Sequence, residues 1–468
     1  MKKQLILLYL IAFAMPALSQ SKTEQLDRLM KHCSANNMLN GTVLVFEKGK
    51  VIYNNAFGVA NKTTGEPLKV ESSFYLASVS KAFTAMAIML LQEQNKLSYE
   101  DKLSTYFPEF PAYANKVTIQ HLLNHTSGIP DYFRLNVYRP GLKNSDVLAV
   151  LQKQDSLDFM PGQRYSYSNG GYVLLSMIVE KVSGMSYPEF MKQRVFQPLG
   201  MKNTLVYNQS TAPIKNRAIG YNLLGEKDDY EILTTGDGGM FSTVQDMYLW
   251  LQAQAGGKLV SEQTMKQAFT PAVLNNGKLS NYGFGWGLVE REQKKYIEHG
   301  GSLAGFRTYV SNGLSDGNGH ILLTNYGDAV AMNELNRSIG RILAGLPYEL
   351  PKIPISSKLI QSLNTTNAGE AIQPAKNLLN ERPGEYVADE EKINLLGYSY
   401  LQRKQPAVAK QIFQFNIDTH PSSANVFDSM GEALLAMGDT ANAVLNYKQS
   451  LLLNPNNRNA VNVLKRVG

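Results

Sequence analysis

The chain has 468 residues and a formal net charge of +7, and this length is enough for two or three domains. Hydrophobic residues make up 44% of the chain and charged residues 18%, which is typical of a globular protein and excludes a disordered or fibrous one. The basic excess is modest and forms no lysine or arginine cluster that could follow a phosphate backbone, so nucleic acid is disfavoured as a partner.

The first 19 residues have the pattern of a secretory signal peptide. Lys2 and Lys3 precede a short apolar run over residues 5–15, and the small residues Ala17 and Ser19 follow. Such a run is too short to span a bilayer comfortably, and small residues are typical of a signal-peptidase site. We expect cleavage after residue 19, a periplasmic or secreted protein, and no membrane span once the signal is removed. An uncleaved membrane anchor is the alternative.

Cysteine usage limits how the exported chain can be stabilised. Cys33 is the only cysteine, so an intramolecular disulfide is excluded and core packing must supply the stability. A single thiol of this kind is more often buried and inert than catalytic. We therefore do not expect Cys33 to be the nucleophile of an active site.

The first elements can be predicted from local patterns. Residues 41–59 are typical of a β-hairpin, with a turn at residues 47–50. Residues 82–92 are apolar nearly all round, which predicts a buried central helix. Further along, residues 282–288 and 308–310 have strand-like sequences. Strand-like and helix-like segments therefore alternate in a first domain over residues 22–346.

A composition shift follows this domain. Residues 347–384 combine scattered polar residues with five prolines, which are Pro347, Pro351, Pro354, Pro374 and Pro383. Proline disfavours continuous helices and strands, so we expect this segment to be a linker with some helix.

The last segment, residues 385–468, carries an internal repeat with a period of 34 residues. The matched pairs are Gly397 and Gly431, Ala409 and Ala443, Phe413 and Tyr447, and Pro421 and Pro455. This pattern resembles the tetratricopeptide repeat (TPR) and predicts two all-α repeats followed by a capping helix over residues 461–467. Because three or more repeats are usually needed for independent stability, we expect the module to dock on another surface, including that of a protein partner. Helical hairpins with chance spacing are the alternative.

The first candidate catalytic motif is the Ser-x-x-Lys formed by Ser78 and Lys81 at the start of the predicted buried helix. A spacing of three residues places both side chains on one helix face. Burial would lower the pKa of Lys81, so that a neutral amine could take the proton of the Ser78 hydroxyl. The alternative is a helix-capping serine followed by a solvated lysine.

Two further motifs follow in order. In the Tyr-x-Asn of residues 167–169, Tyr167 could be a second proton shuttle if a cation such as Lys81 lowers its pKa, and Asn169 could hold Lys81 or the substrate. In the His-Gly-Gly of residues 299–301, His299 could donate to a substrate carboxylate or join the proton relay. A surface tyrosine and a loop histidine are the respective alternatives.

The residues that follow His299 also predict an oxyanion hole. Gly301 would let the substrate backbone approach the strand closely. The next backbone N–H, of Ser302, could then pair with the N–H of Ser78 around the oxygen that becomes negative during acyl transfer. We therefore expect Asn169, His299, Gly301 and Ser302 to bind the substrate or the oxyanion, and Ser78, Lys81 and Tyr167 to carry the reaction.

Over residues 24–345 the chain resembles the serine β-lactamase and penicillin-binding-protein superfamily, on its class C β-lactamase-related branch. The resemblance rests on the three motifs and on the sequences at residues 122–130, 161–172, 198–201 and 238–246. It implies that Ser78 is the nucleophile, with Lys81, Tyr167 and Asn169 as its partners. The fold it implies is an α/β (α+β) β-lactamase/transpeptidase-like sandwich, in which a mainly antiparallel sheet is flanked by helices and carries a helical lobe.

One departure from the family pattern bears on the substrate. The lactamases of this branch carry Lys-Thr-Gly where this chain has the His-Gly-Gly of residues 299–301, which is more similar to esterase and D-amino-acid peptidase relatives. We expect esters, D-amino peptides or related small acyl compounds as substrates. A class C-type β-lactamase and a catalytically idle protein that binds cell-wall peptide are the alternatives.

No cofactor and no metal are expected. His121 and His125 are four residues apart, but no His-Glu-x-x-His accompanies them, so we interpret both as structural.

Overall fold

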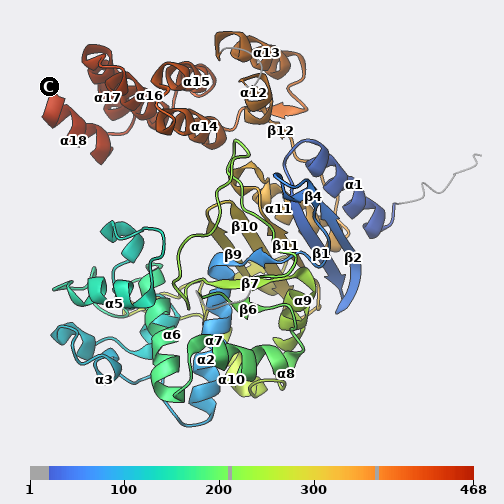
Figure 1. The fold of residues 1–468 in the computed structure, drawn as a ribbon, viewed down its shortest axis with the longest axis vertical. Helices are drawn as coiled ribbons and strands as arrows, with labels where there is room; N and C mark the ends of the chain where they lie inside the picture. Colours follow the sequence, from blue (N-terminus) through green and yellow to red (C-terminus); the bar gives the residue numbers. More distant parts are fainter. Residues whose placement is uncertain (1–19, 209–212, 364–367, 468) are drawn as a thin grey trace, which may run out of the picture.

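The computed structural model describes residues 20–208, 213–363 and 368–467, so the predicted signal peptide lies outside the described residues. The centre of the first domain is a six-stranded antiparallel sheet with the order β2-β1-β11-β10-β9-β8 (Figure 1). Its strands are β1 (Gly41–Glu47), β2 (Lys50–Phe57), β8 (Gly287–Arg291), β9 (Lys294–Leu303), β10 (Phe306–Gly313) and β11 (Gly319–Thr324). The predicted antiparallel sheet and the hairpin near the N-terminus are confirmed.

Helices cover both faces of this sheet, and strand β1 shows why. Its side chains alternate between two apolar clusters, because successive residues of a strand point to opposite faces. Val43 and Val45 pack with α1 (Lys22–Ala35) and α11 (Met332–Leu343), whereas Leu44 and Phe46 join the larger core. Cys33 is buried in the first of these clusters.

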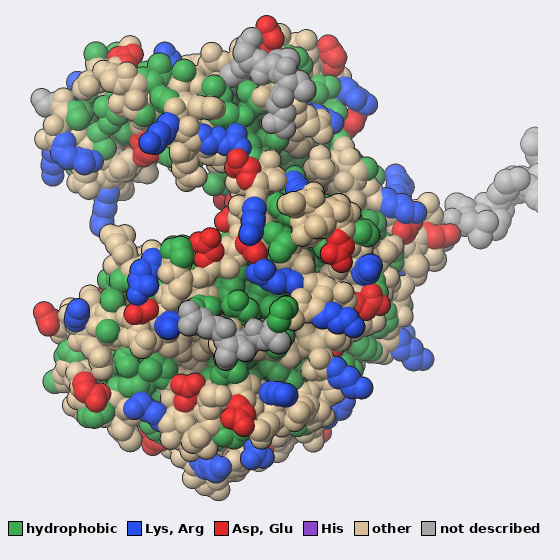
Figure 2. Space-filling view, in the orientation of Figure 1, with side chains coloured by type: hydrophobic (Ala, Val, Ile, Leu, Met, Phe, Trp, Pro, Cys, Tyr) green, Lys and Arg blue, Asp and Glu red, His purple; other side chains and the backbone are tan. Residues whose placement is uncertain are grey.

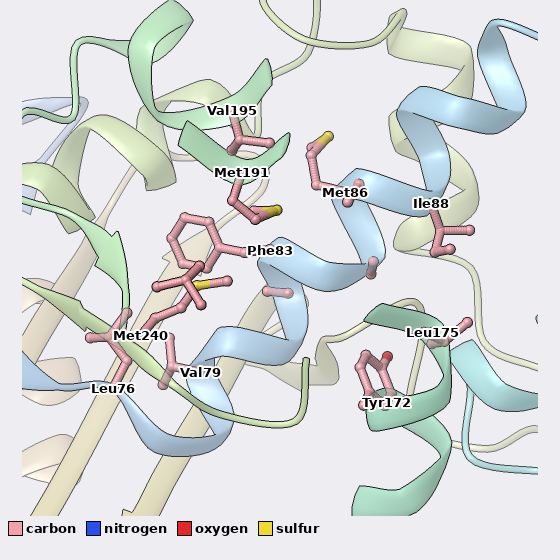
Figure 3. Close-up of a cluster of buried hydrophobic side chains, with 14 of the residues drawn as sticks. Leu76, Val79, Phe83, Met86, Ile88, Tyr172, Leu175, Met191, Val195 and Met240 are labelled. Carbon is pink, nitrogen blue, oxygen red and sulfur yellow. The ribbon is translucent and has the colours of Figure 1, made fainter. Parts of the chain in front are cut away.

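The larger core is built around α2 (Ser80–Glu93), in which every residue from position 80 to position 91 is buried. Figure 3 shows this cluster, with Phe83 among side chains from neighbouring elements. The ring of Phe83 stacks on Trp250 of α9 (Val244–Ala253), with their centroids 3.9 Å apart. The prediction of a buried central helix is confirmed.

A helical lobe lies beside α2 on the side away from the sheet (Figure 1). The lobe contains α3 (Leu103–Tyr106), α4 (Ile119–Leu123), α5 (Asn144–Gln152), α6 (Asn169–Ser183), α7 (Tyr187–Met191) and α8 (Gln197–Leu199). Helix α10 (Glu262–Ala268) contacts α2. A small sheet lies beside the start of α2 and consists of β5 (Phe74–Tyr75), β7 (Met240–Ser242) and β6 (Leu205–Val206).

The strand predicted over residues 282–288 is wrong for its first part, because β8 begins only at Gly287. Gly285 has a φ of +73°, a left-handed conformation that interrupts a strand. A Cβ at this position would lie 2.7 Å from the Cα of Ala82 on α2. The glycine therefore lets the chain pass directly against the catalytic-motif helix instead of extending the sheet.

The C-terminal part is helical throughout most of its length. Its elements are β12 (Ile353–Pro354), α12 (Ile355–Leu363), α13 (Ala368–Glu381), β13 (Tyr386–Val387), α14 (Glu390–Gln402), α15 (Pro406–Thr419), α16 (Ala424–Ala436), α17 (Thr440–Leu453) and α18 (Arg458–Val467). The segment predicted to be a linker with some helix therefore contains two helices, α12 and α13, that pack into the same apolar core as the helices after them.

The two helix pairs α14–α15 and α16–α17 follow the 34-residue period. A Cβ at Gly397 would lie 2.2 Å from the ring of Phe413, and one at Gly431 would lie 2.8 Å from the ring of Tyr447. Each pair thus packs an aromatic ring on a glycine at the same position of the repeat. The predicted module is all-α, and its assignment to the tetratricopeptide class stays a prediction.

A long connection between β6 and β7 joins the two parts of the molecule, and we call its residues 220–239 the tongue. Figure 1 shows the tongue rising from the first domain to α14. At its tip Leu223 is buried in the core of the C-terminal helices, and Glu226 pairs with Arg403 at 2.5 Å. Figure 2 shows an opening between the C-terminal helices and the first domain beside this contact.

Within the described part of the chain, every helix is too short or too polar to cross a bilayer.

The tongue contact leads to a prediction about stability. Leu223→Ala removes a leucine that is 7% exposed and should lower the opening free energy of the C-terminal helices by about 2–4 kcal/mol, as expected for a buried leucine. Hydrogen exchange of the α14 amides measures this opening. Leu445→Ala, at a position that is 62% exposed, is the matched control. Equal exchange in the two variants would contradict a stabilising contact.

Candidate active site

Ser78 lies in a tight 3-10 turn, η1 (Ala77–Val79), that leads directly into α2. The preceding residue, Ala77, has a φ of +48°, an unfavourable conformation for a residue with a side chain. Such strain is concentrated at functional sites, where surrounding structure holds it in place. The turn presents a partly exposed Ser78 beside the first turn of a buried helix.

Lys81 is fully buried, and its amine contacts three oxygen atoms. Its Nζ lies 3.0 Å from Ser78 Oγ, 2.8 Å from Asn169 Oδ1 and 2.8 Å from the backbone oxygen of Asp237. Burial lowers the pKa of Lys81 to about 8, although the carboxylates of Asp237 and Asp131 act in the opposite direction. The spacing of Ser78 and Lys81 therefore brings the two groups together as predicted.

The partners of Lys81 also fix the direction of its lone pair. Asn169 Oδ1 and the Asp237 carbonyl can only accept hydrogen bonds. A neutral amine has two N–H groups, and these two acceptors take both. Its lone pair then faces the hydroxyl of Ser78, which is the arrangement that a general base requires.

Tyr167 packs near both groups, but its electrostatics differ from the expectation. Lys81 Nζ lies 4.9 Å from the centre of the Tyr167 ring, and the imidazole of His125 packs 4.2 Å from it. The pKa of Tyr167 is raised above its ordinary value, because burial outweighs the opposing hydrogen bond with Ser78. Tyr167 is therefore a neutral phenol at physiological pH, and the expected lowering of its pKa by Lys81 is not found.

The Tyr-x-Asn turn is held by residues of the helical lobe. The N–H of Ser168 donates to His125 Nδ1 at 3.2 Å, and the hydroxyl of Ser168 caps α6 by accepting from the N–H of Gly171. Asn169 is the first residue of α6. His121 has a capping role of its own, since its Nδ1 accepts from the N–H of Thr118 at the start of α4. Both histidines are structural, as interpreted from the sequence.

His299 has no ring nitrogen free for a substrate. Its Nδ1 lies 2.6 Å from the Gly300 carbonyl, which can only accept, so this nitrogen carries the proton. Its Nε2 then accepts from the hydroxyl of Tyr282 at 2.9 Å. Burial lowers the pKa of His299 to about 4, so the ring is neutral. The expectation that His299 donates to a substrate carboxylate stays a prediction, and it would require the ring to give up one of these two hydrogen bonds.

Strand β9 approaches the serine turn at Gly301. A Cβ at this glycine would lie 2.2 Å from the backbone oxygen of Leu76 and 2.4 Å from Thr308 Oγ1. Only glycine fits this contact, which brings the backbone of β9 against η1. Ser302 follows on the same strand, paired with Arg307 of β10. An oxyanion hole formed by the N–H groups of Ser78 and Ser302 stays a prediction.

Two carboxylates of the site were missed in the sequence. Asp237, at the base of the tongue, is buried, and its Oδ2 accepts from the hydroxyl of Tyr132 at 2.8 Å. Asp131 accepts from the side-chain amide of Asn169. Desolvation raises the pKa of Asp237. The available signals were an acid between two glycines, at residues 236–238, and an acid directly after Pro130.

Among the side chains that the structure describes, no group of three or more His, Cys, Asp or Glu residues gathers where it could hold a metal ion.

The first domain is similar to known proteins in sequence and in fold. The profile of the family described as Beta-lactamase matches residues 26–343, about the whole first domain. The chain therefore belongs to the Beta-lactamase family, and it is a serine hydrolase of the β-lactamase and penicillin-binding-protein type. The resemblance inferred from its motifs is confirmed.

Individual relatives agree with this assignment. Penicillin-binding protein 4* of Bacillus subtilis (strain 168) is 37% identical over 364 residues, which cover 73% of this chain and 80% of that protein. The octameric penicillin-binding protein homologue from Pyrococcus abyssi has a TM-score of 0.63 at 26% identity, covering 72% of this chain and 80% of that chain. D-amino acid amidase from Ochrobactrum anthropi SV3, with a TM-score of 0.59 at 24% identity, shares the fold; the match covers 69% of this chain and 100% of that chain.

The glycine contact yields a matched pair of variants. Gly301→Ala places a methyl group into the Leu76 carbonyl and should displace β9 from η1, lowering stability by about 1–3 kcal/mol as overpacking does. Gly300→Ala meets its nearest atom only at 3.7 Å and should leave thermal unfolding almost unchanged. Calorimetry of both variants measures the difference, and similar melting temperatures would contradict the close approach.

The electrostatics of Lys81 predict how the reactivity of Ser78 depends on pH. Because the neutral amine takes the proton and its pKa is about 8, the labelling rate of Ser78 by a fluorophosphonate should rise from pH 6 and level off above about pH 9. Lys81→Arg keeps its charge throughout this range and should show slow labelling without the rise. A rate that falls with increasing pH would exclude Lys81 as the base.

Proposed function

We propose that the protein is an exported serine hydrolase that forms an acyl-enzyme at Ser78 and acts on esters, D-amino peptides or related small acyl compounds. One observation carries this proposal. The hydroxyl of Ser78 lies 3.0 Å from the amine of a fully buried Lys81, whose other two contacts are both acceptors. Such an amine has its lone pair directed at the hydroxyl that must lose a proton.

The first chemical step follows from this arrangement. Ser78 Oγ attacks the carbonyl carbon of the substrate and passes its proton to Lys81, while the electron pair of the C=O bond moves to the carbonyl oxygen. The N–H groups of Ser78 and Ser302 would stabilise the resulting oxyanion. When the C=O bond re-forms, the bond to the leaving group breaks and the leaving group takes a proton. The acyl group stays on Ser78.

Tyr167 is suited to deliver that proton. As a neutral phenol hydrogen-bonded to Ser78, it can donate its hydroxyl proton to the leaving group and recover one from the protonated Lys81. Water then attacks the acyl-enzyme by the reverse sequence of proton transfers and releases the acid. In this mechanism Lys81 is the base and Tyr167 is the relay.

The chemistry of β9 supports substrates that place no carboxylate against this strand. The position of the family's strand lysine holds His299, which is neutral and has both ring nitrogens in hydrogen bonds. A β-lactam antibiotic carries a carboxylate, and His299 offers that group neither a charge nor a free donor. Esters and amides that lack such a carboxylate are therefore the better fit.

Two further parts of the proposal rest on the sequence. Export is supported by the signal-peptide pattern of residues 1–19, which predicts a periplasmic or secreted location. A protein partner is proposed for the helices after residue 385, since repeats of the tetratricopeptide kind bind proteins through their surfaces.

A pair of serine variants tests the nucleophile. Ser78→Ala should abolish hydrolysis of p-nitrophenyl esters, a loss of about 10³-fold or more, because the attacking atom is gone. Ser80→Ala is the matched control, since Ser80 is buried two residues away with no hydrogen-bond partner for its hydroxyl in the described structure. Equal ester hydrolysis by wild type and Ser78→Ala would refute the proposal.

Mass spectrometry distinguishes the alternatives. A fluorophosphonate adduct on Ser78 of the wild type supports an active nucleophile, whereas absence of any adduct favours a catalytically idle binding protein. Faster turnover of nitrocefin than of esters would instead favour a class C-type β-lactamase.

A further inference from the structure

Asp131 has a geometry that none of the three motifs explains. It follows Pro130 and precedes a 3-10 turn, η3 (Tyr132–Leu135). Its Oδ1 accepts from the N–H of Phe133 at 3.3 Å, which caps this turn. Its two carboxylate oxygens also lie 3.3 and 3.1 Å from Nδ2 of Asn169. The side chain of Asn169 therefore links this carboxylate to the amine of Lys81.

This contact determines the orientation of the Asn169 amide. A side-chain amide has one donating end and one accepting end, whereas an ionised carboxylate only accepts. Asp131 therefore binds the NH₂ end, and the oxygen must point the other way, to Lys81 Nζ at 2.8 Å. With the amide reversed, its NH₂ group would face the amine of Lys81, and its oxygen would face the carboxylate.

The neighbouring residue holds the second acceptor of Lys81. The hydroxyl of Tyr132 donates to Oδ2 of Asp237 at 2.8 Å, and the backbone oxygen of Asp237 accepts from Lys81. Two consecutive residues, Asp131 and Tyr132, thus contact the side chains of the two residues whose oxygen atoms accept from the amine. Their common segment links the helical lobe to the tongue across the site.

Asp131 also acts on Lys81 through its charge. The charged and titratable groups around this amine are Asp131, Asp237, Tyr167, Tyr172, His125 and His299. Only the two aspartates carry a negative charge that raises the pKa of Lys81 against the effect of burial. The orientation and the charge of Asp131 can therefore be separated by experiment.

We propose that Asp131 is a positioning residue of this site, which acts through Asn169 to hold the amine of Lys81 against the hydroxyl of Ser78. The inference rests on the proposed function, since it requires Lys81 to be the base. It assigns to Asp131 a role beyond capping η3. It also explains why the amide of Asn169 faces a carboxylate on one side and an amine on the other.

The test compares Asp131→Asn with Asp131→Ala by the rate at which a fluorophosphonate labels Ser78 between pH 6 and pH 10. Both variants lose the negative charge, so the rising limb should move to lower pH by roughly one unit, a typical effect of one nearby charge. Asp131→Asn keeps an oxygen that can accept from Asn169 and Phe133, and its plateau rate should stay within about threefold of the wild type.

Asp131→Ala loses that acceptor as well. Its plateau rate should fall by about tenfold or more, because a freely rotating Asn169 amide no longer holds the base in place. Asp155→Asn, at an exposed position of the same lobe, is the matched control and should keep the wild-type profile.

The outcomes distinguish positioning of Lys81 from simple capping of η3 by Asp131. If Asp131 capped η3 and acted on Lys81 by its charge alone, the Ala variant would melt at a lower temperature but keep the wild-type plateau rate, which overturns the inference. Unchanged plateau and midpoint in both variants would overturn it too. Failure of the wild type to label at all would instead refute the proposed function, and the inference with it. If Asp131→Ala does not fold, Asp131→Ser replaces it, because serine can still cap a helix start but offers Asn169 no carboxylate; a wild-type plateau rate in this variant overturns the inference.

Discussion

The burial of one amine governs the organisation of this site. Removing the Lys81 amine from water costs several kcal/mol, so the interior must supply polar partners at close range. These come from three separate parts of the fold: the hydroxyl of Ser78 at the start of α2, the amide of Asn169 at the start of α6, and a backbone oxygen of the tongue at Asp237. The three parts must therefore assemble together before the amine can be accommodated, and the same contacts direct its lone pair.

Local patterns were sufficient for the features that depend on neighbours in the chain. The hairpin of β1 and β2, the all-round apolar sequence of α2 and the three-residue spacing of Ser78 and Lys81 are each determined within a few residues of the chain. Asp131 and Asp237 could not be assigned in this way, because Asp237 meets the amine of Lys81, and Asp131 the amide of Asn169, only through tertiary packing. The hydrogen bond between Tyr282 and His299 could not be predicted for the same reason.

Two segments show where composition misleads. Residues 282–286 are rich in aromatic residues, which are typical of a strand, yet the left-handed φ of Gly285 turns the chain against α2. Residues 347–384 contain five prolines, yet α12 and α13 form there, and α13 accommodates Pro374 in its interior. In both cases a surface that is distant in sequence decides the conformation: α2 for the first and the C-terminal helices for the second.

The border between the two parts of the molecule does not coincide with one position in the sequence, because the tongue belongs to the first domain but packs into the core of the C-terminal helices. Leu223 belongs to the core of the C-terminal helices, and fourteen residues later the carbonyl of Asp237 binds Lys81. A chain that ended near residue 346 would keep every motif residue but would expose Leu223, which the C-terminal helices bury in the full chain. Removal of the helical module therefore uncovers apolar surface on the enzyme domain, at the tip of the tongue, so the two parts are not freely interchangeable units.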